Sequence, residues 1–267
     1  MTAKNLAARE GKLDTKPCAN PSGQRGIVGS CNCRRPASVF VYGLRSNIAK
    51  TPFITKCKSS DLECAKASAS KALPIFAAGV PDLGIEVFDP ITFDKVDSSS
   101  QNLKFILTDI TVKGLSKCAV QKLERDASKI NIQFLCTASL DGNYDLEGQV
   151  LVLTVKGKDK VHITLRDVEI NVELDIADKT GADGKKHWNV KRLHHSFSLK
   201  NKADVVFDNL FKGNDALAQA ALDLFEESGN DILQELGAPM IKETILRVAK
   251  SVKNLFAAVP VDELSID

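Results

Sequence analysis

Apolar and polar residues alternate through the middle of the chain in the way that is typical of β-strands. The alternating segments are rich in β-branched residues and lie at 102–115, 129–140, 144–157, 160–178 and 196–211. Turn-forming residues separate them at 97–100, 141–143, 156–159 and 180–184. Because these connections are too short for crossover helices, the pattern predicts a meandering antiparallel sheet.

After residue 213 the period becomes helical. Apolar residues fall on one face at Leu217, Ala221 and Leu224, and again at Ile241, Ile245, Val248, Val252 and Leu255. Gly229, Gly237 and Pro239 interrupt this pattern, so we expect a long helix of about 40 residues with a break or kink there. A shorter helix is predicted to begin near Asp61, whose side chain can serve as its N-cap.

A helix of that length would extend for ~60 Å and needs an equally long apolar surface beside it. The concave face of the sheet is the candidate surface. The predicted fold is therefore α+β, with a curled antiparallel sheet wrapped around a long C-terminal helix. If side chains do not fill the resulting tube, an internal hydrophobic tunnel remains for an elongated apolar ligand.

The segment GVPDLGIEVFDPI (79–91) combines large apolar side chains with residues that regular structure rejects. Pro81 and Pro90 exclude both a helix and a central strand, while glycines permit tight turns. We expect its apolar side chains to turn inward as a rim near one tunnel end, and its acids to cap turns or face solvent. On this hypothesis Phe88→Ala weakens ligand binding more than it weakens folding.

Charge divides the chain into two parts. Residues 1–50 carry nine Lys+Arg and two Asp+Glu, a net of +7, whereas the other 217 residues carry 27 and 32, a net of −5. We interpret residues 1–52 as a basic, disordered leader and residues 53–267 as the folded domain. A transit peptide and a non-native leader are both compatible with this composition. The overall net charge of +2 argues against a dedicated nucleic-acid-binding protein.

The sequence shows neither a secretory signal nor an apolar run of about 18 residues, so no stable membrane insertion is expected. Catalysis also has little support. Residues 181–186 have the wrong spacing for a phosphate-binding loop and are better interpreted as a hairpin tip. The histidines, His162, His187, His194 and His195, lack a partner motif and are expected at the surface or rim. No catalytic residue, metal site or cofactor is predicted.

The cysteines outside the leader form two pairs. Cys57 and Cys64 flank a short loop that a disulfide can close readily, and a zinc site is the competing interpretation. Cys118 and Cys136 are equidistant from residue 127, so a hairpin centred there would place them opposite each other. A second disulfide and two buried free thiols both remain open for this pair.

Several short motifs occur together in an order that is specific to one known family. They are the Cys57–Cys64 pair before a helix, the segment 79–91, and the motifs at 112–116, 142–148, 209–213 and 259–264. Over residues 53–266 the chain resembles the insect takeout and juvenile-hormone-binding protein family. The resemblance implies a tubular lipid-binding fold with an internal tunnel, an oxidised Cys57–Cys64 pair and secretion into haemolymph or sensory fluid. It also implies carriage of a lipid, fatty-acid-like molecule, isoprenoid, juvenile hormone or carotenoid.

The chain departs from the family's pattern in two ways, and the second places it nearer to the takeout branch than to the hormone carriers. The basic leader stands where a secretion signal is expected. The family's hormone carriers have a disulfide in the C-terminal half and a tyrosine hydroxyl for the ligand's polar end, whereas here no cysteine follows Cys136 and the tyrosines are Tyr42 and Tyr144.

The alternating apolar residues supply the candidates for the tunnel lining, of which we expect half to line a cavity and half to form solid core. They are Val80, Leu83, Ile85, Phe88, Phe105, Leu107, Phe134, Leu151, Leu153, Ile163, Leu165, Phe197, Phe207, Leu217, Leu224, Met240 and Ile245. The leading hypothesis is a secreted, monomeric carrier of one small hydrophobic ligand, without enzymatic activity. The alternatives are a signalling or interaction module with a structural ligand, and lipid exchange at membranes.

Overall fold

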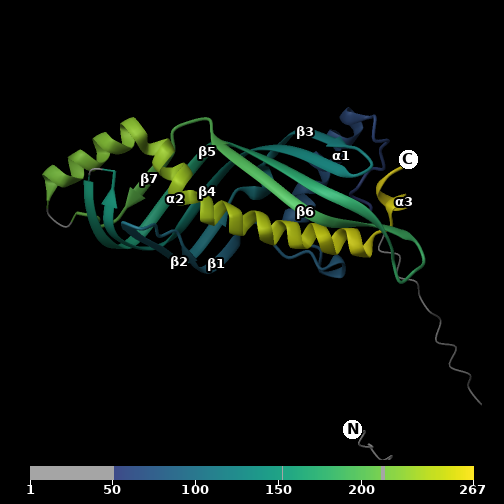
Figure 1. Ribbon diagram of the computed structural model, residues 1–267, viewed down its shortest axis with the longest axis horizontal. Helices are drawn as coiled ribbons and strands as arrows, with labels where there is room; N and C mark the ends of the chain where they lie inside the picture. The colour runs from purple at the N-terminus through teal and green to yellow at the C-terminus, as the bar shows by residue number, and fades with distance from the viewer. Residues whose placement is uncertain (1–50, 152, 212–213) are drawn as a thin grey trace, which may run out of the picture. The chain divides into compact units, whose positions relative to one another are not determined.

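A long curved antiparallel sheet forms the larger part of the computed structural model, which describes residues 51–151, 153–211 and 214–267 (Figure 1). Its central path is β1 (Ile91–Asp97), β2 (Leu103–Lys113), β4 (Lys129–Val150), β5 (Leu153–Thr180) and β6 (Lys186–Leu199). β3 (Ala119–Arg125) pairs with β4, and β7 (Asp204–Phe207) pairs with β5. All these pairings are antiparallel, which confirms the predicted sheet. Except for Thr51 and Pro52, the predicted leader lies outside the described residues.

Two turns predicted from the sequence were wrong. Residues 141–143 lie inside β4 and residues 156–159 lie inside β5, so these strands reach 22 and 28 residues. The glycines in these segments let neighbouring atoms pack closely against the strand and do not form turns. A Cβ on Gly142 would lie 3.1 Å from the carbonyl oxygen of Thr108, and one on Gly157 would lie 2.6 Å from the hydroxyl oxygen of Tyr144.

The other two predicted turns are present. Asp97 ends β1 and accepts a hydrogen bond from the main-chain N–H of Ser99 (3.0 Å). Residues 181–185 connect β5 to β6, with Gly184 in the left-handed region (φ +77°). The sequence 181–186 is therefore a hairpin tip, as predicted.

Helix α1 (Leu62–Ala77) begins where the sequence predicted. The side chain of Asp61 accepts a hydrogen bond from the main-chain N–H of Cys64 (3.0 Å), which satisfies one unpaired donor of the first turn. The Cys57–Cys64 disulfide joins the segment that leads into the helix to its first turn. Two short 3-10 helices follow, η1 (Pro81–Leu83) and η2 (Leu115–Lys117).

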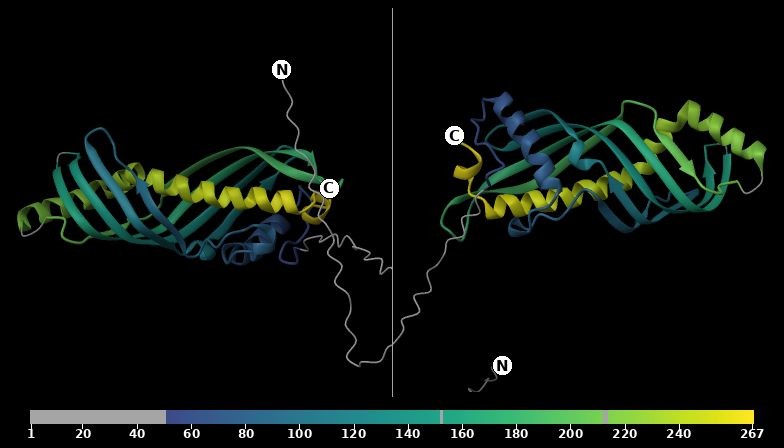
Figure 2. Two further views of the ribbon diagram at one scale, coloured as in Figure 1. Left: turned by 90° about the horizontal axis from the view of Figure 1, so that it is seen from below. Right: turned by 180° about the vertical axis from the view of Figure 1, so that it is seen from behind.

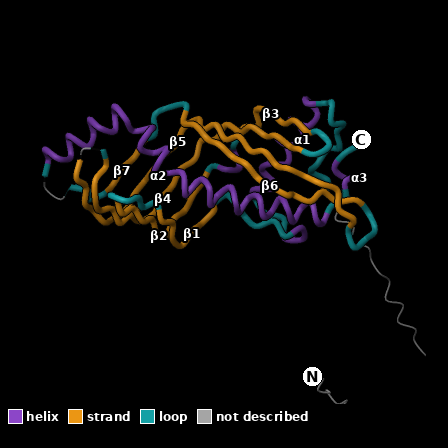
Figure 3. Tube along the Cα trace, in the orientation of Figure 1, coloured by secondary structure: helices purple, strands orange, loops and turns teal. Residues whose placement is uncertain are grey.

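Helix α2 (Asp215–Ala258) is 44 residues long and is capped by the side chain of Asn214, which accepts from the main-chain N–H of Leu217 (3.1 Å). It continues without a break past Gly229, Gly237 and Pro239, and bends along its length (Figure 1). A kink is thus present and a break is not. Figures 2 and 3 show its C-terminal half lying against the inner face of the sheet, with the short α3 (Val261–Leu264) beyond it.

The segment 79–91 is irregular, as expected, and is fastened to α2. Arg247 forms an ion pair with Glu86 and donates to the carbonyl oxygen of Thr92 (2.6 Å). Asn254 donates to the carbonyl oxygen of Gly84 (2.7 Å). These contacts hold the loop between the C-terminal half of α2 and β1.

Candidate ligand-binding site

Three apolar cavities follow one another between α2 and the sheet. Cavity 1 has a volume of about 150 Å³, cavity 2 about 80 Å³ and cavity 3 about 70 Å³. Cavities 1 and 2 share Leu115, Cys136, Ile170, Thr244 and Ile245 in their walls. Cavities 2 and 3 share Leu140, Leu165, Met240 and Ile241. The three spaces are therefore successive chambers separated by single layers of side chains.

The inner face of the sheet supplies one wall. In cavity 1, Ile132 on β4 pairs with Val172 on β5, and Phe134 pairs with Ile170. Directly paired residues point to the same face, so these side chains turn inward together. In cavity 3 the pair of Leu140 with Ile163 continues this wall along the same two strands. The great length of β4 and β5 thus creates a continuous apolar surface.

One face of α2 supplies the opposite wall. Its lining residues recur at helical spacing, from Ile232 and Leu236 in cavity 3 through Met240 and Ile241 to Val248 and Val252 in cavity 1. The sequence pattern had already placed Ile241, Ile245, Val248 and Val252 on one face. A single helix therefore borders all three cavities.

Helix α1 and the segment 79–91 close cavity 1. Phe76 on α1 stacks on Phe88 with 5.7 Å between ring centroids, and both line the cavity. Phe88 is only 2% exposed. It is thus part of an enclosed wall rather than an exposed rim.

The second cysteine pair forms part of the same wall. Cys118 and Cys136 are joined by a disulfide, which resolves the two alternatives left open by the sequence. Cys118 lines cavity 1, and Cys136 lines cavities 1 and 2. This bridge ties the start of β3 to β4 beside the cavities.

Most of the residues predicted to line a tunnel border these cavities. They are Phe88, Phe105, Leu107, Phe134, Ile163, Leu165, Phe197, Phe207, Met240 and Ile245. Val80, Leu83, Ile85, Leu153 and Leu224 do not, and Leu83 and Ile85 are buried in solid core. Leu151 is 59% exposed beyond the end of β4, and Leu217 borders an outer hollow near the start of α2. Contact with a ligand stays a prediction for all of them.

The sequence did not single out some of the lining residues. They include Leu73 and Phe76 on α1, Leu115 on η2, and Ile132, Ile170, Val172 and Leu193 in the sheet. The strand alternation identified these sheet positions as apolar without showing which ones meet a cavity. For α1, only the packing of the helix against cavity 1 reveals the role of its last turns.

The histidines differ in their surroundings. His162 and His194 are exposed, as predicted, but His187 is 5% exposed. Its Nδ1 donates to the carbonyl oxygen of Phe256 (3.0 Å), and its Nε2 lies 3.1 Å from Oδ1 of Asp183. The surface prediction was therefore wrong for His187, because the end of α2 covers the β5–β6 hairpin at this point.

Tyr144 has a structural role in the described residues. Its side chain is 1% exposed, and its hydroxyl donates to the carbonyl oxygen of Asp208 (2.6 Å). Burial raises the pKa of this hydroxyl to about 12. Tyr144 borders none of the three cavities, and Tyr42 lies outside the described residues.

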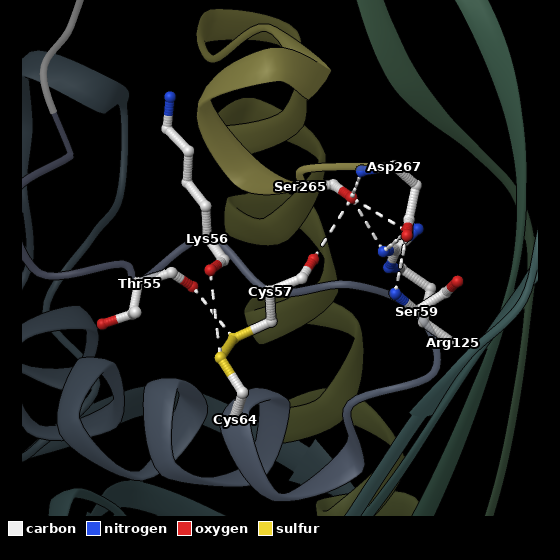
Figure 4. A network of polar contacts seen from close by, with 8 residues as sticks. All are labelled: Thr55, Lys56, Cys57, Ser59, Cys64, Arg125, Ser265 and Asp267. Carbon is white, nitrogen blue, oxygen red and sulfur yellow. Dashed lines mark hydrogen bonds and ion pairs between the residues drawn. A yellow bond between two sulfur atoms is a disulfide. The ribbon is translucent and has the colours of Figure 1, made fainter.

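A polar network fastens the segment after α3 to the segment before α1 (Figure 4). Arg125 donates to the Ser265 hydroxyl (2.8 Å) and pairs with Asp267, which accepts from the main-chain N–H of Ser59 (2.8 Å). The Arg125 hydrogen bond is the main reason why the pKa of Asp267 falls to about 2. Cys57 lies within this network, so the first disulfide and the segment after α3 are held together.

Within the described residues, no group of three or more His, Cys, Asp or Glu residues is arranged to hold a metal ion. The helices of this part of the chain include none that is long and apolar enough to cross a membrane.

One family model and two curated proteins resemble this chain, over different shares of its length. A family model described as haemolymph juvenile hormone binding protein matches residues 37–266. The circadian clock-controlled protein daywake of Drosophila melanogaster is 24% identical over 253 residues, which cover 89% of this chain and 93% of daywake. A putative beta-carotene-binding protein of Schistocerca gregaria is 24% identical over 127 residues, 46% of this chain and 51% of that protein.

A solved structure shares the fold. The crystal structure of Takeout 1 from Epiphyas postvittana matches with a TM-score of 0.76 and 27% sequence identity, covering 80% of this chain and 100% of that one. The similarity therefore extends through the sheet and the long helix that border the three cavities.

Proposed function

The chain belongs to the takeout and haemolymph juvenile hormone binding protein family, and we propose that it carries one elongated hydrophobic ligand in cavities 1, 2 and 3. The observation that carries this proposal is the series of three apolar spaces with shared walls. No chemical step is proposed, because these walls consist almost entirely of hydrocarbon side chains.

The dimensions favour a long ligand. Lining residues on α2 extend from Ile232 to Val252, and a rise of about 1.5 Å per residue makes this stretch ~30 Å long. The separate volumes are small for a ligand pocket, which typically holds about 300–1,000 Å³. A bound chain must therefore displace the side chains between the cavities. Met240, which separates cavities 2 and 3, is unbranched and adapts readily to such a change.

The ligand classes that suit this space are lipids, fatty-acid-like molecules, isoprenoids including juvenile hormone, and carotenoids. Their affinity would come from buried apolar area, at about 25 cal/mol per Å² before the costs of association. The haemolymph family and the two disulfides support a secreted protein, since disulfides persist in oxidising compartments. We propose that the carrier acts as a monomer.

A pair of substitutions on α2 tests the site. Ala249 lines cavity 1 and is 8% exposed, whereas Ala257 is exposed on the same helix. After extraction of bound lipid, titration with the fluorescent polyene parinaric acid should show saturable binding to the full chain. Ala249→Leu should weaken binding several-fold because the larger side chain occupies cavity 1, and Ala257→Leu should leave it unchanged.

Two results would contradict the carrier proposal. One is an absence of saturable parinaric acid binding, together with an absence of co-purified lipid in native mass spectrometry. The other is equal binding by both leucine variants, which would place the bound probe outside cavity 1. Thermal unfolding of each variant serves as the control for folding.

Lipid exchange at a membrane surface has less support. The outer hollow near the start of α2 is bordered by Leu217 and by three lysines, Lys104, Lys156 and Lys158. These lysines pair with Asp145 or Glu147, so their charge is largely neutralised where anionic lipid would have to bind. The signalling alternative gains no specific observation from the described residues.

A further inference from the structure

A buried serine hydroxyl without a hydrogen-bond partner lies beside the ligand space. Ser98 directly follows the last residue of β1 and is 5% exposed. Among the described residues, its Oγ is one of three buried side-chain oxygen or nitrogen atoms without a hydrogen-bond partner. Such a hydroxyl has lost its contacts with water and gained none in return, which is costly in a protein interior. An unpaired group of this kind therefore needs an explanation.

The register of β1 and β2 places the Ser98 side chain on the inner face of the sheet. The strands pair as far as Asp97 and Ile106, and the main-chain N–H of Ser98 then donates to the carbonyl oxygen of Phe105 (2.8 Å). Ser98 is thus directly opposite Phe105. Directly opposed side chains share a face and have Cβ atoms about 4.5–5.5 Å apart. Because Phe105 lines cavity 3, the Ser98 hydroxyl lies one side chain away from that cavity.

The neighbouring inward-facing side chains are apolar. Val96, two residues before Ser98, pairs with Leu107, and both are buried. The Phe105 ring packs edge to face against Phe207, with 6.2 Å between ring centroids, and both rings line cavity 3. A ligand that turns the Phe105 ring aside would meet one polar group among these side chains, the Ser98 hydroxyl.

The charges on β1 and β2 favour an uncharged partner for this hydroxyl. Lys95 and Lys104 alternate with the inward-facing residues, so they point to the outer face, where Lys104 pairs with Asp145 (2.9 Å). Neither lysine can compensate a carboxylate placed beside Ser98. A buried anion without a cation is far more costly than a neutral oxygen group, which the Ser98 hydroxyl can satisfy as donor or acceptor.

From these contacts we infer that Ser98 binds the polar end of the ligand, and that this end is an uncharged oxygen group such as an alcohol, a ketone or an ester. This inference rests on the proposed carrier function and deepens it, because it gives the ligand a direction. The polar end lies beside cavity 3, and the hydrocarbon tail extends through cavity 2 into cavity 1. The new hydrogen bond removes the cost of the unpaired hydroxyl, so it favours the loaded protein.

His195 is the competing polar group. It pairs with Val172, which lines cavity 1, so its ring is also on the inner face, and its Nδ1 is buried without a partner. The side chain as a whole is only partly buried, however, whereas Ser98 is almost completely buried. A partly accessible imidazole has less to gain from a ligand than a hydroxyl that solvent does not reach.

Two neighbouring serines provide a matched pair of variants. Ser99 is exposed, and its hydroxyl accepts from the main-chain N–H of Phe105 (3.0 Å), so Ser99→Ala removes a structural bond close to Ser98. Dodecan-1-ol and dodecane are each used to displace parinaric acid from the delipidated full chain. Ser98→Ala should weaken the binding of dodecan-1-ol ~10-fold, which corresponds to ~1.4 kcal/mol, and leave that of dodecane unchanged. Ser99→Ala should change both affinities by the same factor.

Thermal unfolding without ligand separates binding from folding. Because the Ser98 hydroxyl has no partner in the folded chain, Ser98→Ala should leave Tm unchanged or raise it, whereas Ser99→Ala should lower it. A lower Tm for Ser98→Ala without a loss of dodecan-1-ol affinity would mean that the hydroxyl binds a structural water, which overturns the inference.

The other possible failures are distinguishable. Absence of parinaric acid binding overturns the carrier proposal and this inference with it, whereas equal effects of Ser98→Ala on dodecan-1-ol and dodecane overturn this inference alone. A selective loss of dodecan-1-ol binding in His195→Leu, with none in Ser98→Ala, would assign the polar end to His195 and overturn it as well. If dodecanoic acid loses as much affinity as dodecan-1-ol in Ser98→Ala, the restriction to uncharged groups is wrong.

Discussion

Asp89 shows how a single side chain can organise an irregular loop. Its carboxylate accepts hydrogen bonds from the main-chain N–H groups of Gly114 (3.0 Å) and Ser116 (2.9 Å) and from the Ser116 hydroxyl. Burial alone would raise the pKa of Asp89, but these bonds outweigh it and hold the pKa below its usual value. The sequence-based expectation that an acid of this segment caps a turn is confirmed here.

Asp89→Asn should therefore lower the free energy of unfolding by ~1 kcal/mol at neutral pH, because a neutral amide makes weaker bonds to these donors. A depressed pKa in the folded state stabilises the fold above the unfolded-state pKa of about 3.9, and this contribution is lost as the pH falls through the lower, folded-state value. The difference between the wild type and the Asp89→Asn variant should thus shrink below pH ~4. Urea unfolding at several pH values would reveal it, and a difference independent of pH would contradict this account.

The burial of Phe88 in the structure revises the prediction that Phe88→Ala weakens ligand binding more than it weakens folding. Because its ring is buried against Phe76 rather than exposed at a rim, Phe88→Ala should lower the free energy of unfolding by ~3 kcal/mol or more. Val87→Ala, at the adjacent exposed position, should cost less than ~0.5 kcal/mol. Urea unfolding compares the two. Equal small effects would mean that Phe88 is not part of the wall.

At this scale the sequence identified apolar residues better than it identified their direction. Phe105 and Leu107 border cavity 3, whereas Leu151, chosen by the same alternation, is exposed. The difference depends on where β4 ends, and a strand's end cannot be fixed by alternation alone. His187 likewise became buried through contact with the distant end of α2, which no local pattern contains.

Helix α2 is the element on which the site depends. Gly237 lies in its interior, and a Cβ at that position would meet no atom within 4 Å. Gly237→Ala should therefore raise the free energy of unfolding by ~0.5–1 kcal/mol, since alanine loses less backbone entropy in a helix.

The matched control for this substitution is Gly157→Ala in β5. There the added Cβ would lie 2.6 Å from the Tyr144 hydroxyl oxygen and 3.0 Å from Cα of Leu210, so we expect destabilisation. Thermal unfolding should show a higher Tm for Gly237→Ala and a lower Tm for Gly157→Ala than for the wild type. A destabilised Gly237→Ala variant would indicate that this position needs the flexibility of glycine.

The elements themselves were largely predictable. The helical period after residue 213 and the cap at Asp61 both follow from local chemistry, and the structure confirms both. Gly142 and Gly157 suggested turns that do not exist, because a glycine that permits close packing inside a strand has the same sequence signal as one in a turn.

For the described part of the molecule as a whole, ligand occupancy should determine thermal stability. A ligand that binds the folded state alone adds ~2.7 kcal/mol to the free energy of unfolding at about 100 times its Kd. Extraction of bound lipid should lower Tm, and octadecanoic acid should restore it. The Tm of the Ala249→Leu variant should rise less when octadecanoic acid is added, because the larger side chain occupies cavity 1. Differential scanning fluorimetry would measure these shifts, and a Tm that ignores both extraction and added acid would contradict an internal site.

The antiparallel sheet and the long helix were predicted from periodicity, and the need of so long a helix for an equally long apolar surface predicted that the sheet wraps around it. An internal tunnel was predicted on the condition that side chains leave the tube unfilled, but the position and size of the three cavities were not predictable, because they depend on how closely the two surfaces approach. That distance is set by contacts remote in sequence, such as those of Arg247 and Asn254 with the loop before β1.

Because α2 continues without a break past all three cavities, its turns lie at regular intervals along the whole ligand space. Each turn of the helix advances by about 5.4 Å and presents one or two side chains to the ligand space, from Ile232 to Val252. Enlarging the side chain at the turn that ends the ligand space would shorten the usable chain length by one such step and leave the remaining turns unchanged. Selectivity for ligand length can therefore change by single substitutions, without altering the sheet that encloses the ligand.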